Sequence, residues 1–162
     1  MNVFLAYVRD PNYFQHLPER LNRTQSEDNR IKVMAFPPLG IQTLAPVLRQ
    51  RGHTVRMFDT CHPEMTADHI VQAAEQERPD AIALSFISTT TYPTTKDLAK
   101  QLKEKVPAIP ILVGGPFATV NSDRILRDCP DIDCVGIGEG EELIPDYLNH
   151  IDAPGTVTGK GP

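Results

Sequence analysis

The stretch IPILVGGPFA, residues 109–118, decides the fold of this chain because it joins a buried strand to a turn of bare backbone. Its apolar run at 111–113 has the length of a buried strand. Gly114 and Gly115 follow, and two glycines permit unusual backbone angles and let a ligand approach the main chain. Pro116 then ends strand pairing and pre-sets a turn. Open α/β sheets build ligand sites this way at the carboxyl ends of their strands, although a plain strand-to-helix turn would use the same glycines.

Length and composition limit the class of protein. A chain of 162 residues suits one domain with a sizeable core. The net charge of −5 and the lack of a basic run argue against a nucleic-acid partner. No apolar stretch is long enough for a membrane span, and no signal segment is present at the amino terminus. Cys61, Cys129 and Cys134 form no CxxC pair, and their odd number argues against a disulfide framework. These features predict a reduced, cytoplasmic protein.

Apolar runs and helical periods alternate along the chain. Strands are predicted at 3–8, 54–58, 80–86, 111–113 and 132–137. Helices are predicted from Gly40 to Gly52, at 66–77, 92–106 and 121–129, and from Gly140 to about residue 150. Five strands alternating with helices predict an α/β fold, a doubly wound five-stranded parallel sheet flanked by helices, and 2-1-3-4-5 is the favoured order.

The remaining segments define the predicted domain organisation. Residues 1–150 are expected to form the domain, with residues 9–36 as a long loop after the first strand. Residues 151–162 have no core-forming pattern and are expected to be a linker.

The predicted strand order reverses between strands 1 and 3, which places a ligand site in the loops after strands 1, 3 and 4, beside strand 5. These loops offer small residues and hydrogen-bonding groups but few nucleophiles or acid–base pairs. That profile favours a holder for a large neutral or amphipathic cofactor over a catalytic site. The candidate site residues are Pro38, Leu39, Ser85, Ser88, Thr89, Thr90, Gly114, Gly115, Pro116, Gly138, Glu139 and Gly140.

Several familiar sites are excluded by their missing residues. A nicotinamide fingerprint needs glycines after strand 1, where the sequence has Val8-Arg9-Asp10-Pro11. A phosphoacceptor receiver needs an aspartate ending strand 3, where Ser85 and Phe86 stand. The chain has no GxxxxGK[ST] motif, and its histidines are dispersed, so neither a P-loop nor a histidine metal cluster is predicted.

Four segments together resemble a known family. They are PPLGIQTLAPVLRQRGHTVRMFD at 37–59, ALSFISTTTYP at 83–93, PILVGGPFAT at 110–119 and DCVGIGEGEE at 133–142. In order and spacing they resemble the cobalamin-binding, Rossmann-like domain that precedes a radical S-adenosylmethionine domain, over residues 37–148.

The resemblance implies a corrinoid that lies across the carboxyl ends of the strands, with its nucleotide tail in a slot beside the sheet. Ser85 and the hydroxyls at 88–90 would line the tail and the corrin edge, although turn and helix capping would also explain those hydroxyls. Gly114 and Gly115 would let the tail approach the backbone. The segment 138–140 would close the site from strand 5.

One departure from related cobalamin proteins concerns the cobalt ligand. The DxHxxG motif, whose histidine ligates cobalt, is missing, since Asp10 is followed by Pro11 and Asn12. The hypothesis is therefore cobalamin with neither its own base nor a protein histidine on cobalt, or with Tyr13 or water below. His16 is a weaker candidate, because a solvated loop histidine is the more ordinary interpretation.

The chain also lacks the CxxxCxxC spacing of a radical domain's iron–sulfur cluster. The resemblance thus implies a binding module that does not catalyse alone. S-adenosylmethionine and the cluster would belong to a missing partner domain of a methyltransferase or oxidative cyclase. Two alternatives stay open: a nucleotide- or nucleotide-sugar-binding α/β enzyme domain, and a cofactor-free interaction domain.

Overall fold

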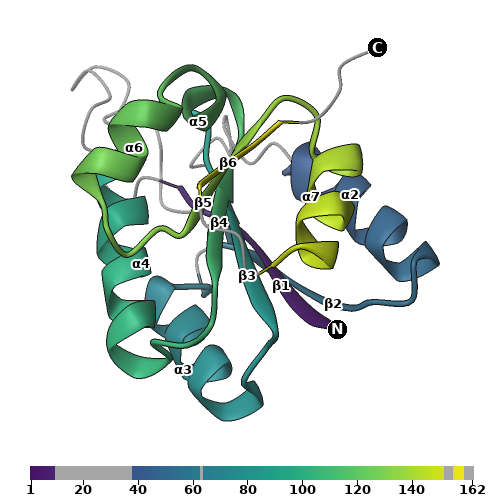
Figure 1. Ribbon diagram of the computed structural model, residues 1–162. Helices are drawn as coiled ribbons and strands as arrows, with labels where there is room; N and C mark the ends of the chain where they lie inside the picture. The colour runs from purple at the N-terminus through teal and green to yellow at the C-terminus, as the bar shows by residue number, and fades with distance from the viewer. Residues whose placement is uncertain (10–37, 63, 152–154, 159–162) are drawn as a thin grey trace, which may run out of the picture.

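The computed structural model describes residues 1–9, 38–62, 64–151 and 155–158. Its centre is a six-stranded parallel sheet in the order β2-β1-β3-β4-β5-β6 (Figure 1). The strands are β1 (Asn2–Tyr7), β2 (Thr54–Asp59), β3 (Ala81–Ser85), β4 (Ile111–Gly114), β5 (Cys134–Ile137) and β6 (Gly155–Thr158). The connection after β1 leads to β2 on one side, and the connection after β3 leads to β4 on the other side. The loops after β1 and β3 therefore diverge at the carboxyl edge of the sheet.

Helices cover both faces of the sheet, which explains why its central strands are apolar throughout. Along β1, Phe4 and Ala6 belong to one buried core, and Val3 and Leu5 belong to the other. This alternation follows from the two-residue period of a strand. Each face of the sheet therefore has its own hydrophobic core.

The two faces carry different helices, as Figure 1 shows. One face is covered by α2 (Leu39–Gln50) and α7 (Gly140–Asn149), which contact each other. The other face carries α3 (Ala67–Glu77), α4 (Tyr92–Lys105), α5 (Pro116–Val120) and α6 (Ser122–Asp128). No helix among the described residues has both the length and the apolar character needed to cross a membrane.

The ends of the helices follow signals in the sequence. Gly52 has a φ of +84° just after α2, and the next N–H, that of His53, donates to the carbonyl of Leu48 at 3.1 Å. Thr66 is the N-cap of α3, and its backbone N–H donates to Nδ1 of His69 at 3.2 Å. Both helix ends lie where the sequence predicted them.

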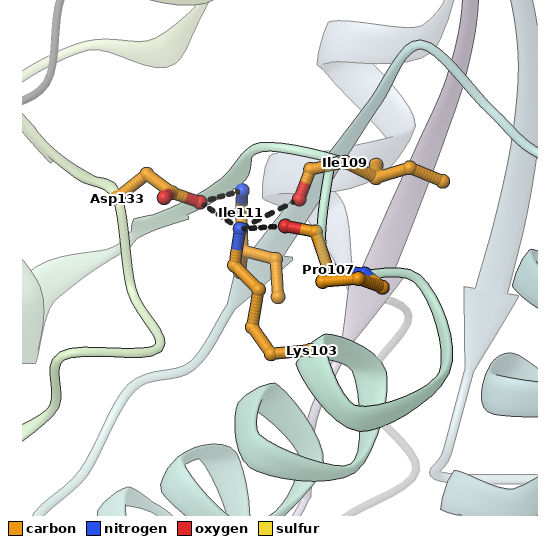
Figure 2. Close-up of polar contacts among 5 residues, drawn as sticks. All are labelled: Lys103, Pro107, Ile109, Ile111 and Asp133. Atoms are coloured by element: carbon orange, nitrogen blue, oxygen red, sulfur yellow. Dashed lines mark hydrogen bonds and ion pairs between the residues drawn. The ribbon is translucent and has the colours of Figure 1, made fainter.

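A polar cluster ties α4 to the amino-terminal edge of the sheet (Figure 2). Lys103 Nζ lies 2.8 Å from Asp133 Oδ2 and donates to the carbonyls of Ile109 at 2.9 Å and Pro107 at 3.3 Å. The same Asp133 oxygen accepts from the N–H of Ile111 at 2.6 Å. The cluster thus satisfies polar groups where β4 begins and where the chain approaches β5.

The structure confirms the α/β class and the 2-1-3-4-5 order of the first five strands. It also adds elements that the sequence analysis did not expect. Strand β6 lies within the segment predicted as a linker and pairs with β5, with Cys134 opposite Gly155. The helix α5 directly follows the double glycine. An edge strand pairs on one side only, and threonine and valine suit strands, so β6 forms without a long apolar run.

Candidate functional site

A cavity of about 700 Å³ opens at the carboxyl edge of the sheet; we call it the edge cavity. Its walls come from the ends of β1, β3, β4 and β5 and from the first turns of α2 and α7. Small side chains on the strands leave this space, notably Ala83 on β3 and Gly136 on β5. The described lining residues are Leu5, Tyr7, Pro38, Leu39, Gly40, Ile41, Leu44, Ala83, Leu84, Ser85, Ile87, Leu112, Val113, Gly114, Gly115, Pro116, Thr119, Val120, Gly136, Gly138, Glu139, Gly140, Glu141, Leu143 and Ile144.

The double glycine forms one wall of the edge cavity, and its two residues have different roles. Gly115 has φ +108° and ψ 176°, a conformation that is essentially restricted to glycine. A Cβ atom on Gly115 would lie 2.4 Å from the carbonyl oxygen of Phe86. A Cβ on Gly114 would meet nothing within 4 Å. Gly115 is therefore required by the fold, whereas Gly114 leaves open space beside the cavity.

The glycines after β5 form a second wall. Gly138 has a φ of +96°, and its N–H donates to Oγ1 of Thr119 at 3.4 Å, which joins this turn to α5. Glu139 is the N-cap of α7, in an extended conformation. At Gly140, a Cβ would lie 3.0 Å from a methyl group of Leu44, so α2 and α7 approach closely here. The strand-5 turn thus belongs to the same cavity as the double glycine.

The hydroxyl-rich loop after β3 divides into two parts. Ser85 lines the edge cavity, but Ser88, Thr89 and Thr90 are not among its lining residues. Ser88 Oγ lies 2.8 Å from Thr90 Oγ1 and 2.7 Å from Thr91 Oγ1. The N–H of Thr91 donates to the carbonyl of Ser88 at 3.2 Å. These contacts form a turn leading into α4, so the hydroxyls of Ser88 and Thr90 interact locally in this structure.

Sequence reasoning found only part of the apolar rim of the cavity, because it included Leu39 but missed Ile87 and Val120. Leu39, Ile87 and Val120 line it, yet their exposed fractions are 67%, 52% and 78%. Apolar side chains in such exposed positions mark a surface that a ligand or partner covers. The available signal was an apolar residue within each polar connection, at Ile87 after β3 and at Val120 before α6.

The charge of the cavity is a further constraint on its ligand. Glu139 and Glu141 are the charged residues among the described lining, and no lysine, arginine or histidine is among them. A phosphate group is ordinarily held by basic side chains or by helix N-termini without adjacent carboxylates. The cavity therefore favours a neutral, largely apolar group.

Beside the cavity, the end of β1 lies close to the turn after β2. Burial raises the pKa of the Tyr7 phenol, and electrostatic interactions with Cys61 and Asp59 raise it further. Thr60 Oγ1 donates to the carbonyl of Tyr7 at 3.0 Å and accepts from the N–H of Arg9 at 2.9 Å. Tyr7 thus presents a protonated phenol to the cavity at neutral pH.

We expect Cys61 to react slowly with alkylating reagents at neutral pH. Burial, followed by the negative charge of Asp59, raises the pKa of the thiol to about 11, and the thiolate is the reactive form. Alkylation by iodoacetamide, followed by peptide mass spectrometry, should accelerate as the pH approaches that value. Asp59→Asn should accelerate it at neutral pH, because asparagine keeps the oxygen that accepts from the Cys61 N–H at 2.9 Å but removes the charge. Equal rates in both proteins would contradict this account.

The predicted cobalt-ligand candidates Tyr13 and His16, and the long loop at 9–36 from residue 10 onward, lie outside the described residues. Within the described part of the chain, no group of three or more histidine, cysteine, aspartate or glutamate side chains could hold a metal ion. None of the three cysteines forms a disulfide.

Comparison with known proteins identifies a family and several relatives. Residues 31–148 match the B12 binding domain. The chain is 31% identical over 120 residues to an uncharacterized methyltransferase of Pyrococcus horikoshii, covering 73% of this chain and 25% of that protein. It is 34% identical over 139 residues to the hopanoid C-3 methylase of Methylococcus capsulatus, covering 80% and 27%. It is 32% identical over 129 residues to an anaerobic magnesium-protoporphyrin IX monomethyl ester cyclase of Synechocystis, covering 76% and 26%. The chain thus spans about a quarter of the length of these relatives.

Proposed function

Because this chain belongs to the B12-binding domain family, we propose that it holds cobalamin with the nucleotide tail inserted in the edge cavity and the corrin ring over its apolar rim. The observation that carries this proposal is the shape and chemistry of the cavity. It is a space of about 700 Å³ at the carboxyl edge of the sheet, with a largely apolar lining and no lysine, arginine or histidine among the described lining residues. These features suit the uncharged base of the tail better than a free nucleotide phosphate.

Different residues around the cavity would contact different parts of the cofactor. Gly114 leaves room for the tail against the backbone of β4, since nothing occupies the space where its Cβ would be. Ser85 offers a hydroxyl at the end of β3. Leu39, Ile87 and Val120 would cover apolar parts of the macrocycle and exclude water from it.

We propose that cobalt carries neither the cofactor's own base nor a protein histidine. A tail base held in the edge cavity would not be available to ligate cobalt, and no histidine is among the described lining residues. Water or Tyr13 would then occupy the lower face. Bound cobalamin supplies a cobalt centre that can carry a methyl group or an electron, while this chain's residues orient and shield it.

The proposed role of the whole protein is methyl transfer or oxidative cyclisation by a radical S-adenosylmethionine domain with its own iron–sulfur cluster. The names of the relatives, which include a methylase and a cyclase, support both reactions. Their greater length supports a further domain, since the chain covers 27% and 26% of them. The described part of this chain has no paired acid and base in the cavity, so it would bind cofactor without catalysing alone.

The test is to mix the purified protein with hydroxocobalamin, remove free cofactor by desalting, and record the visible spectrum. Near-stoichiometric retention with shifted bands is the expected result, and the band positions report the lower ligand. A nitrogen-ligated cobalt spectrum would overturn the ligand assignment. A colourless protein that instead retains a nucleotide or nucleotide sugar in a parallel desalting experiment would overturn the binding assignment.

A further inference from the structure

Two helices wall the edge cavity on the side away from the sheet, and they meet at its mouth. Ile41 and Leu44 line it from α2, and Leu143 and Ile144 line it from α7. The two helices lie next to each other on the same face of the sheet (Figure 1). The distance between them therefore sets the width of the space that an inserted group must fill.

A polar contact joins these helices at the mouth of the cavity. Thr43 Oγ1 on α2 lies 2.7 Å from Glu141 Oε1 on α7 and 3.0 Å from the carbonyl oxygen of Gly40, so the closer, charged carboxylate is the favoured acceptor of its single proton. A hydrogen bond to a charged acceptor is stronger than one between neutral groups. Glu141 also lines the cavity. The contact spans 98 residues of sequence and therefore links otherwise separate parts of the chain.

Both helices need such a link, because each contains an internal proline close to it. Pro46 lies in α2 and Pro145 lies in α7. Proline has no N–H, so the carbonyls four residues earlier, those of Gln42 and Glu141, lose their intrahelical partner. The first of these carbonyls, that of Gln42, is adjacent in sequence to Thr43, and the second is the backbone carbonyl of Glu141 itself. The first turns of α2 and α7 thus have fewer backbone hydrogen bonds at the positions where the Thr43–Glu141 hydrogen bond joins the two helices.

The backbones are also close enough for the bond to control the spacing. A Cβ on Gly140 would lie 3.0 Å and 3.1 Å from the two methyl groups of Leu44, so the first turn of α7 packs directly on α2. The hydrogen bond and this contact lie one residue apart on each helix. Together they form a tie, the Thr43–Glu141 tie, at one edge of the cavity.

We propose that Thr43 and Glu141 are positioning residues that hold the two helical walls at a fixed separation and so slow the escape of an inserted nucleotide tail. This inference rests on the proposed function, because it concerns the part of cobalamin that enters the cavity. The tie acts on the inserted group alone. A corrinoid that lacks the nucleotide tail would not be sensitive to it.

The experiment compares release of hydroxocobalamin with release of cobinamide, a corrinoid without the nucleotide tail. Each is loaded onto the protein, and the visible absorbance that passes a filter is followed over time. Thr43→Val removes the donor at similar volume, and Thr43→Ser keeps it. Glu141→Leu removes the acceptor, and Glu141→Gln keeps a carbonyl oxygen. Thr54→Val, an exposed position at the opposite edge of the sheet, is the matched control.

In Thr43→Val and Glu141→Leu, hydroxocobalamin release should be about fivefold faster, the effect of losing one hydrogen bond. Thr43→Ser, Glu141→Gln and Thr54→Val should release it near the wild-type rate, and the rate for cobinamide should be the same in all of them. Unchanged hydroxocobalamin release in Thr43→Val would overturn the inference. Equal acceleration for both corrinoids would also overturn it, since the tie would then only stabilise the fold. Failure of the wild-type protein to retain hydroxocobalamin would instead overturn the proposed function on which the inference rests.

Discussion

Gly115→Ala should destabilise the protein and abolish retention of hydroxocobalamin. The new Cβ would lie 2.4 Å from the carbonyl oxygen of Phe86, and a φ of +108° is itself strained for alanine. A backbone carbonyl cannot move aside as a flexible side chain can. Phe86 is fully buried, and its ring lies 5.5 Å from that of Phe117 and 6.1 Å from that of Tyr92, centroid to centroid. We expect a loss of about 2–4 kcal/mol in the free energy of unfolding, measured by denaturant titration.

Binding should fail in Gly115→Ala because the Phe86 backbone lies between two lining residues, Ser85 and Ile87. Any movement that relieves the clash displaces both of them. Gly114→Ala is the matched control, since a Cβ there meets nothing within 4 Å and its φ is not positive. It should leave the free energy of unfolding within about 1 kcal/mol of wild type and weaken cofactor retention alone. Equal stability of the two variants would contradict the distinct roles of the glycines.

Most of the fold could be predicted because the apolar pattern of each strand and helix agrees with its position in the sheet or on its face. The apolar runs at β1, β3 and β4 are too continuous for surface strands, and the helices between them carry one apolar face each. Strand β6 could not be predicted, because GTVT has no apolar run and its place depends on pairing with β5. The five-residue helix α5 is too short for a helical period to be recognised.

The candidate site could be predicted where glycines identify its turns, but not where side-chain packing determines which residues face the cavity. Glycines at positive φ, Gly115 and Gly138, identify two turns that reach the same cavity from separate strands. The hydroxyls of Ser88 and Thr90 looked equally suitable, but their direction depends on the turn into α4. The position of Tyr7 in the cavity could not be predicted from the sequence, because an aromatic residue at the end of an apolar strand is ordinarily a core residue.

Lys103→Met should lower the free energy of unfolding by about 1–3 kcal/mol while leaving cofactor retention unchanged. Methionine keeps the apolar stem but removes the ammonium group that contacts Asp133 and the carbonyls of Ile109 and Pro107. The Lys103 side chain is only 16% exposed and that of Asp133 33%, so water replaces these contacts poorly. Figure 2 shows the ammonium group among these three acceptors. They lie near the beginning of β4, whereas the cavity lies at the other end of that strand. Thermal or urea denaturation measures the loss.

A matched control tests whether the stabilisation by Lys103 depends on the burial of its contacts or on the presence of an ion pair alone. Asp128→Asn breaks the ion pair between Arg124 and Asp128, whose side chains are 56% and 42% exposed. Exposed pairs of this spacing contribute at most about 0.5 kcal/mol, so this variant should unfold nearly as the wild type does. A similar loss in both variants would show that the Lys103 cluster contributes no more than a surface pair. A large loss in Lys103→Met alone, with hydroxocobalamin still retained, would show that the amino edge of the sheet contributes stability without contributing to ligand binding. This result follows from the topology of the sheet, because in a parallel sheet the loops that hold ligand lie at the carboxyl edge and a polar cluster at the amino edge can stabilise the fold without touching them.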